Sequence, residues 1–99
     1  MTLAVTFSRR AKADLDDIWD YTCQRWSRDQ ANTYLAGLRS ATDLLADQPH
    51  IARLRQEFSP AVRVHPYRAQ LVIFEADETG LRVIRVMHGR SDWEAALGQ

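Results

Sequence analysis

The second half of the chain carries side chains of the types that could cleave RNA by acid–base chemistry. Apolar residues there alternate with a basic set, namely Arg53, Arg55, Arg63, His65, Arg68, Arg82, Arg85, His88 and Arg90, with Tyr67 among them. A metal-free ribonuclease needs a base for the 2′-hydroxyl, an acid for the 5′-oxygen and arginines for the charge that develops on the phosphate. Histidine can carry either proton because it titrates near neutrality. If these side chains share one open face, the catalytic candidates are Arg63, His65, Arg85 and His88.

The simpler interpretation of the same cations is that they pair with nearby acids. The available carboxylates are Glu57, Glu75, Asp77, Glu78 and Asp92. Composition alone favours ion pairing over a catalytic site. Arg85 lies between Val83 and Met87 on a strand that the pattern predicts to be buried. A buried charge is costly unless paired, so Arg85 must reach a carboxylate, the rim of a groove or a partner.

Other kinds of active site have little support in the sequence. His50, His65 and His88 are far apart and Cys23 is the only cysteine, so no metal-ligand spacing is present. The chain has no glycine-rich phosphate loop and no Gly-x-Ser-x-Gly motif. We therefore expect no metal, no cofactor and no nucleophilic catalysis through Cys23, which we interpret as a packing residue.

Length and composition are those of one small globular domain over residues 1–99. The chain has 45% apolar and 26% charged residues and a formal net charge of zero, so no overall field attracts it to nucleic acid. Direct sequence-specific nucleic-acid binding is not expected. No apolar run approaches the roughly 18 residues of a membrane span, and the first residues do not resemble a signal peptide. We expect a cytoplasmic protein without a membrane partner.

The first half of the chain predicts a short strand followed by an antiparallel pair of helices. Residues 2–7 alternate in polarity, and Ser8 is a candidate N-cap. The apolar stripe of the first helix consists of Ala11, Leu15, Ile18, Trp19, Thr22 and Trp26. Ser27 and Gln30 have capping-box spacing, and Pro49 ends the second helix. The stripe of the second helix consists of Ala31, Tyr34, Leu35, Leu38, Ala41 and Leu45.

Other features of this half have a structural and a functional interpretation. Asp14, Asp16, Asp17 and Asp20 crowd the first helix, where a solvated face is favoured over a docking strip for a basic partner. The large rings of the two stripes should pack within the hairpin and against the sheet. A hairpin this short cannot hide every ring, so one or two of them are candidates for exposure to a partner.

The second half predicts a small sheet. Residues 50–60 read as an irregular connection, residues 61–67 and 81–88 as strands, and residues 69–76 as a central strand because they are apolar on both faces. Residues 77–80 form a hairpin loop in which Gly80 is free to take positive φ, and residues 92–99 form a short helix. The fold class is α+β in the order β-α-α-β-β-β, with the helical hairpin packed on one face of a small, mainly antiparallel sheet.

Alternation assigns the side chains of the last strand to two faces. Ile84 and Val86 are expected to pack under the helices, and Arg85 to face the other side. Gly89 would then let the chain turn, and Arg90 would lie at the exposed exit of the strand.

Three segments, in order and at matching separations, resemble the RelE/ParE toxins of bacterial type II toxin–antitoxin systems. The first reads Ser8-Arg-Arg-Ala11-x-x-Asp14-Leu15-x-x-Ile18-x-x-Tyr21, and the second Ala31-x-x-Tyr34-x-x-x-Leu38, followed by Leu45 and Pro49. The third is Ile84-Arg85-Val86-Met87-His88-Gly89-Arg90-Ser91-Asp92, which is similar to the ParE ending. The resemblance covers nearly the whole chain and implies the β-α-α-β-β-β order.

The resemblance implies a toxin held silent by an antitoxin, and it favours ParE over RelE. RelE-like toxins are ribosome-dependent mRNA endonucleases with a terminal tyrosine, whereas here no tyrosine follows Tyr67 and Gly89 follows His88. ParE-like toxins poison DNA gyrase without catalysis of their own. The chain departs from ParE at Pro49-His-Ile-Ala52, where Pro-x-x-Gly is common, and at Phe74-Glu75, where a tyrosine often ends the strand.

These expectations define the candidate residues and partners. The partners are a ParD-like antitoxin, in a hetero-oligomer, and DNA gyrase. Candidates for target binding are Arg85, His88, Arg90 and Trp93. Candidates for antitoxin binding are Trp19, Trp26, Tyr34 and Tyr67. The alternatives are the mRNA endonuclease and a folded relative without toxicity.

Overall fold

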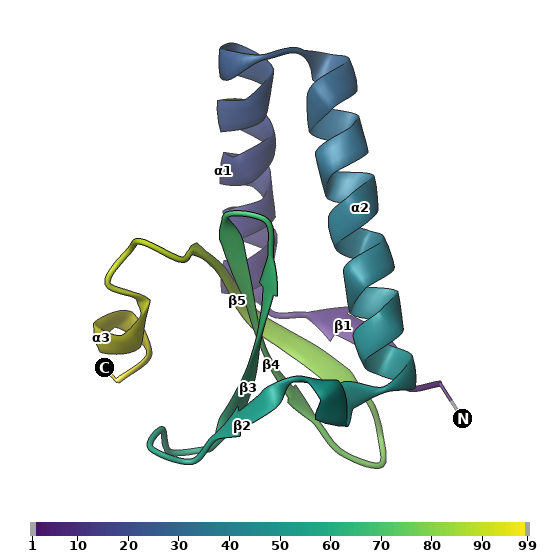
Figure 1. The fold of residues 1–99 in the computed structure, drawn as a ribbon, viewed down its shortest axis with the longest axis vertical. Helices are drawn as coiled ribbons and strands as arrows, with labels where there is room; N and C mark the ends of the chain where they lie inside the picture. Colours follow the sequence, from purple (N-terminus) through teal and green to yellow (C-terminus); the bar gives the residue numbers. More distant parts are fainter. Residues whose placement is uncertain (1, 99) are drawn as a thin grey trace.

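A computed structural model of the protein describes residues 2–98. A tall helical hairpin stands against a twisted five-stranded sheet (Figure 1). The elements are β1 (Val5–Phe7), α1 (Arg9–Arg25), α2 (Arg28–Asp47), a 3-10 turn (Pro49–Ile51), β2 (Arg53–Arg55), β3 (Val62–Tyr67), β4 (Gln70–Ala76), β5 (Leu81–His88) and α3 (Trp93–Leu97). The predicted fold class is confirmed. The terminal helix was predicted to reach residue 99, which lies outside the described residues.

Both helices of the hairpin begin where the capping signals predict. The Ser8 hydroxyl accepts a hydrogen bond from the Ala11 amide, and the Ser27 hydroxyl accepts one from Gln30, each at 3.0 Å. Such caps satisfy amides that have no partner within the helix and stabilise it by about 1 kcal/mol each. The connection between the two helices is therefore short, and α1 and α2 lie antiparallel along most of their length (Figure 1).

The sheet has the order β1-β5-β4-β3-β2, with β1 parallel to β5 and the other pairs antiparallel. β4 occupies the centre, as its apolar sequence predicts. β2 is an addition, because residues 50–60 were expected to be irregular. Three residues are too few to show an alternating pattern, and β2 forms by pairing with β3 at the edge of the sheet.

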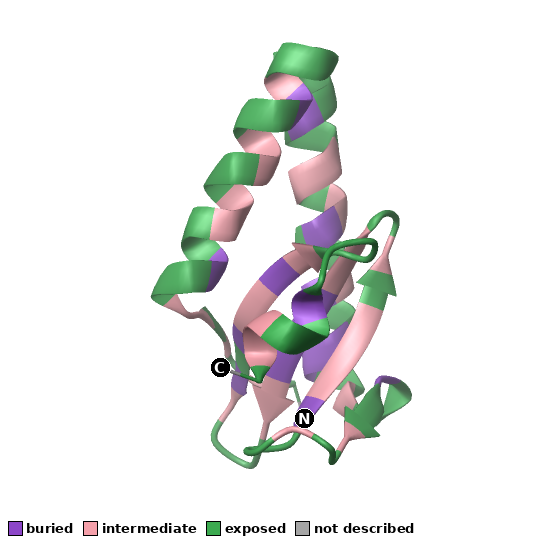
Figure 2. Ribbon diagram, turned by 90° about the vertical axis from the view of Figure 1, so that its left-hand side faces the viewer, coloured by how far each residue is buried: buried purple, intermediate pink, exposed green. Residues whose placement is uncertain are grey.

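Both faces of the sheet are covered, although only the helical face was expected to be. Under the helices lie Phe74, Leu81, Val83 and Val86 with the inner residues of the hairpin. The opposite face carries a second cluster, here called the α3 cluster, formed by Val62, Ile73 and Trp93 with Phe58, Val64, Leu71, Ile84, Met87 and Leu97. In Figure 2, α3 lies on the near side, in front of the sheet. The open basic face that a ribonuclease site requires is therefore occupied in part by apolar packing.

A β-bulge in β5 breaks the alternation that the sequence predicts. Ile73 pairs with Arg85 and Phe74 with Val83, so Ile84 is the extra residue. Val86 consequently packs under the helices, as expected, whereas Ile84 belongs to the α3 cluster. The prediction that Ile84 and Val86 share a face was wrong, because a bulge shifts the side-chain period by one residue.

The turn before β5 was predicted to have a glycine with positive φ, and the structure shows a different turn. Gly80 does not take positive φ. One Asp77 carboxylate oxygen accepts hydrogen bonds from the Thr79 hydroxyl, the Thr79 amide and the Gly80 amide at 2.6, 2.8 and 3.2 Å. These hydrogen bonds lower the pKa of Asp77, and the bond from the Thr79 side chain has the largest effect. Glycine is needed for another reason, since a Cβ at Gly80 would lie 2.9 Å from the Ala4 carbonyl oxygen.

Replacing Gly80 with alanine is expected to destabilise the protein by about 1–3 kcal/mol, because backbone must move to admit the methyl group. Chemical denaturation followed by circular dichroism measures this loss. The matched control is Gly89→Ala, where a Cβ would meet its nearest atom at an ordinary 3.6 Å. Equal stability of the two variants would show that the close approach to Ala4 is not a constraint.

The β3–β4 turn contains a strained residue. Tyr67 pairs with Gln70, which leaves a two-residue loop, and Arg68 has φ of 53°. It is the only non-glycine residue with positive φ among those described. Arginine pays about 1–2 kcal/mol to adopt this conformation, which glycine adopts freely.

Candidate functional site

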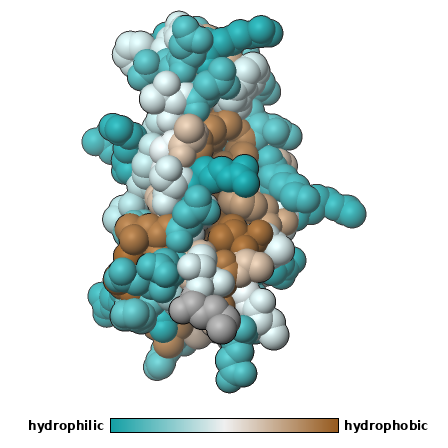
Figure 3. All heavy atoms as spheres, turned by 90° about the vertical axis from the view of Figure 1, so that its right-hand side faces the viewer, coloured by the Kyte–Doolittle hydropathy of each residue, from teal (hydrophilic) through white to brown (hydrophobic). Residues whose placement is uncertain are grey.

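A large groove lies where the helical hairpin meets the end of the sheet. Its volume is about 830 Å³. The helical wall consists of Asp14, Asp17, Ile18, Tyr21, Thr22, Trp26, Gln30, Thr33 and Tyr34, and the sheet wall of Tyr67, Arg68, Ala69, Gln70, Arg85, Val86, Met87, His88 and Ser91. We call it the hairpin groove. On the side of the molecule shown in Figure 3, polar side chains divide the apolar surface into separate patches.

Exposed aromatic rings are concentrated in the hairpin groove. Tyr21 is 64% and Trp26 is 68% exposed, which is unusual for large apolar side chains in a protein of this size. Arg25 lies 5.9 Å from the Trp26 ring centroid. The end of α1, where Tyr21 lies, and the turn after it, which holds Trp26, belong to the part of the hairpin that extends beyond the sheet (Figure 1). A partner bound there would remove the exposed rings from water.

Two tyrosines join the helical wall to the sheet wall. The Tyr34 and Tyr67 rings meet edge to face at 5.3 Å, and the Tyr67 hydroxyl donates to the Tyr34 carbonyl at 3.2 Å. A Cβ at Gly37 would lie 3.1 Å from the Tyr67 ring, so glycine allows the ring to lie against α2. Burial raises the pKa of Tyr34 and the neighbouring Tyr67 adds to the rise, whereas the side chain of Gln70 and, to a smaller extent, the charge of Arg68 oppose it.

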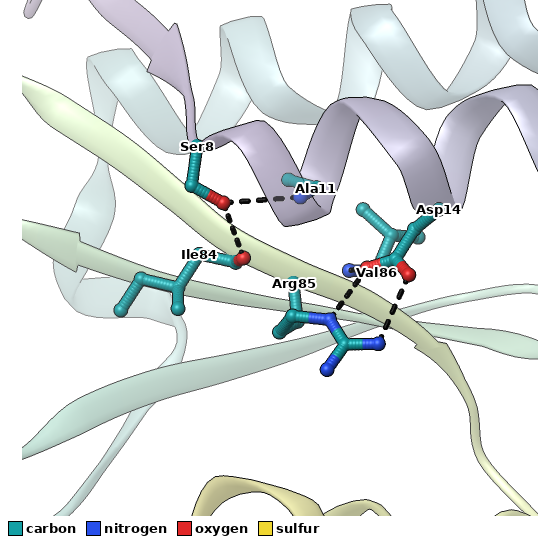
Figure 4. Close-up of polar contacts among 6 residues, drawn as sticks. All are labelled: Ser8, Ala11, Asp14, Ile84, Arg85 and Val86. Atoms are coloured by element: carbon teal, nitrogen blue, oxygen red, sulfur yellow. Dashed lines mark hydrogen bonds and ion pairs between the residues drawn. The ribbon is translucent and has the colours of Figure 1, made fainter.

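Arg85 reaches a carboxylate, which is one of the three outcomes predicted for it. Its Nε and one terminal nitrogen donate to the two oxygens of Asp14 at 2.8 and 3.0 Å (Figure 4). The same carboxylate accepts the Val86 amide at 2.9 Å. The hydrogen bond to Asp14 raises the pKa of Arg85, and partial burial opposes the rise. Arg85 is thus held in place by α1 rather than directed into solvent.

Two side chains, from the N-cap and the second turn of α1, form hydrogen bonds with the backbone of β5 where β1 no longer pairs with it. The pairing of β1 with β5 ends at Phe7 and Val83. Beyond it, the Ser8 hydroxyl donates to the Ile84 carbonyl at 2.6 Å, and Asp14 accepts the Val86 amide (Figure 4). Backbone groups that would otherwise lack partners are therefore satisfied by α1.

His88 and Arg90 lie at the exposed end of β5. The His88 imidazole Nδ1 accepts the Arg90 amide at 3.0 Å, and the His88 carbonyl accepts the Ser91 amide and hydroxyl at 3.0 and 2.6 Å. His88 also lines the hairpin groove. Their predicted part in target binding stays a prediction.

The four residues proposed for RNA cleavage are not gathered at one point. Arg85 is occupied by Asp14, and Arg63 donates to the Ala52 carbonyl at 2.7 Å. His65 pairs across the sheet with Val72, whereas His88 pairs with Gln70 in another row and two strands away. Strand spacing alone separates these histidines by about 10 Å. The basic set is also divided, since Arg53 and Arg55 pair with Val64 and Val62 of the α3 cluster.

Trp93 is 8% exposed and lies inside the α3 cluster. The Arg55 guanidinium lies 5.2 Å from its ring centroid and binds Glu57 and Glu94 at 2.6 and 3.3 Å. Glu57 is one of the acids predicted as ion-pair partners. Trp93 is therefore placed to fix α3 on the sheet, and any contact with a target stays a prediction.

The structure places three of the four antitoxin candidates at the hairpin groove, and their part in antitoxin binding stays a prediction. Trp26, Tyr34 and Tyr67 line the groove, whereas Trp19 lies elsewhere and donates from its indole nitrogen to Asn32 at 3.3 Å. Asp14 was missed, because it stands in a run of aspartates that reads as a solvated face. The signal that could have identified it is the buried Arg85, which requires an acid.

Residues 2–98 also bear on the kind of site that the protein holds. No cluster of three or more histidine, cysteine, aspartate or glutamate side chains there is arranged to hold a metal ion. Within the same residues, no helix has the length and apolar character needed to span a membrane.

A helical hairpin on a mainly antiparallel sheet, with an aromatic groove where they meet, places the protein in the RelE/ParE class of small α+β proteins. Residues 5–93 match the family described as "ParE toxin of type II toxin-antitoxin system, parDE". The chain belongs to the ParE toxin family.

Two relatives support this assignment to the ParE toxin family, and one solved structure supports the fold. The chain is 37% identical to Toxin ParE1 of Caulobacter vibrioides over 93 residues, which are 92% of this chain and 94% of the relative. It is 36% identical to Toxin ParE1 of Mycobacterium tuberculosis over 98% of this chain and 100% of the relative. A chain of the "Chromosomal ParDE TA system from P. aeruginosa" shares the fold, with a TM-score of 0.74 at 18% identity, over 88% of this chain and 96% of that chain.

Proposed function

We propose that this toxin acts in the cytoplasm as one domain over residues 1–99, that a ParD-like antitoxin neutralises it, and that DNA gyrase is its target. The observation that carries the antitoxin proposal is the hairpin groove. It offers exposed Tyr21 and Trp26 on a rigid hairpin, and a flexible apolar segment could fold into it on binding.

Expression together with the small protein encoded beside the toxin gene tests the antitoxin proposal. The two chains are expected to co-purify through an affinity tag on either one, and the pair to withstand size-exclusion chromatography. The toxin alone is expected to arrest growth, and the pair to permit it. Normal growth with the toxin alone would favour a non-toxic relative.

The gyrase proposal rests on membership of the ParE family. It is supported by the pairing of Arg85 with Asp14 and by the separation of His65 from His88, since the residues proposed for RNA cleavage then share no acid–base site. Purified toxin is expected to block supercoiling by gyrase and to increase cleaved DNA, because a binding toxin traps its target without chemistry of its own. Adding the antitoxin should restore supercoiling. Unchanged gyrase activity at a stoichiometric excess of toxin would contradict this target, and new mRNA ends on translating ribosomes would instead support cleavage of mRNA.

A further inference from the structure

Some charged side chains of the hairpin groove form ion pairs and others do not. Asp14 and Arg85 bind each other, so neither presents a free charge to a ligand. Arg68 on the β3–β4 turn and Asp17 on α1 also line the groove, and neither has an ion-pair partner among residues 2–98. The sheet wall therefore carries an unpaired positive charge, and the helical wall an unpaired negative one.

Arg68 is exposed, and the turn sets its backbone conformation. Its backbone adopts the left-handed φ of 53° that the two-residue turn requires, a conformation in which glycine or asparagine is the ordinary choice. Its guanidinium lies 5.8 Å from the centroid of the Tyr67 ring. That ring is itself fixed by the hydrogen bond to α2 and by contact with Tyr34. The guanidinium therefore lies near the Tyr67 ring, on the sheet wall of the groove.

Strained backbone kept by a residue that does not favour it points to a function for the side chain. The side chain lies near the Tyr67 ring but makes no ion pair within the described residues, so no carboxylate there accounts for the arginine. Arginine is well suited to a carboxylate, which its planar fork can bind through two hydrogen bonds.

We propose that Arg68 is a specificity residue of the hairpin groove, which binds an acidic side chain of the amphipathic antitoxin segment that occupies the groove. This inference rests on the proposed antitoxin function. The apolar face of that segment covers Tyr21 and Trp26, and its acidic residue reaches the β3–β4 turn. A basic residue towards Asp17 would complete the match, so the two charges fix the direction in which the segment lies.

Titration calorimetry with the purified antitoxin tests this role. Arg68→Gln is expected to weaken binding about tenfold, and Arg68→Glu about a hundredfold, because the second change places a like charge opposite the acid. The matched control is Arg82→Gln, since Arg82 is an exposed arginine of β5 outside the groove, and its affinity should equal that of the wild type. Raising the salt concentration should weaken the wild type more than Arg68→Gln.

Two further measurements separate binding from folding. Arg68→Gly should melt at the same temperature as the wild type or higher, because the turn favours glycine, and yet bind about as weakly as Arg68→Gln. Replacing the acidic residues of the antitoxin with lysine, one at a time, should yield one variant that restores binding to Arg68→Glu.

The outcomes distinguish the inference from the function on which it rests. Wild-type affinity in both Arg68→Gln and Arg68→Gly would overturn the role of Arg68 and leave the antitoxin proposal standing. Failure of the wild-type toxin to bind the antitoxin would overturn the antitoxin proposal itself. Equal losses in Arg68→Gln and Arg82→Gln would also overturn the inference, because the effect would then arise from net charge.

Discussion

Asp14→Ala is expected to remove about 2–4 kcal/mol from the free energy of unfolding. The substitution leaves the Arg85 guanidinium without its carboxylate, although only 18% of that side chain is exposed. It also leaves the Val86 amide without its acceptor. A domain of this size is stable by roughly 5–15 kcal/mol, so the loss is a large share of the total. Urea denaturation followed by circular dichroism measures it.

The neighbouring aspartate provides the control for this prediction. Asp17 lies on α1 one turn after Asp14 but is exposed and makes no ion pair among the described residues. Asp17→Ala should therefore change stability by less than about 0.5 kcal/mol. Asp14→Asn should fall between the two, because an amide oxygen can still accept the Val86 amide. A loss below about 1 kcal/mol in Asp14→Ala would contradict the importance of this contact.

The parts of the fold that sequence predicts well are those specified locally. Ser8 and Ser27 cap their helices as the spacing indicates, because a cap depends on residues only three positions apart. The strand at residues 70–76 is central because its side chains are apolar on both faces. Each of these features can be recognised in a window of a few residues.

The features that sequence reasoning missed depend on contacts between distant segments. Ile84 is a bulge only in relation to the register of β4. Asp14 looks like its neighbours until Arg85, 71 residues away, is brought beside it. Trp93 packs beside Phe58 in the α3 cluster, a contact that nothing near it in sequence indicates. No local pattern encodes such pairings.

The candidate site was predicted in part for the same reason. The aromatic residues of the hairpin were recognised from their spacing, yet their spacing alone cannot tell a buried ring from an exposed one. Arg68 was recognised only as one cation among many, because its significance comes from a backbone angle. What distinguishes Trp26 from Trp19 is likewise a tertiary property, since the two tryptophans lie seven positions apart on the same stripe.

That difference leads to a second prediction with a large expected effect, this time on binding. Trp26→Ala should weaken antitoxin binding about 30- to 100-fold, because a large aromatic ring that becomes desolvated is the usual energetic centre of an interface. Its effect on the stability of the free toxin should be small, since the ring is 68% exposed. Titration calorimetry and thermal melting of the same preparations measure the two quantities.

Trp19→Ala is the matched control, and its effects should be reversed. Trp19 is half-buried, bonded to Asn32 and outside the hairpin groove, so its loss should lower stability by about 1–3 kcal/mol while the folded protein keeps its affinity. Equal losses of affinity in the two variants would mean that the antitoxin covers both sides of the hairpin. Full affinity in Trp26→Ala would contradict the proposal that the antitoxin binds in the hairpin groove, which Trp26 lines.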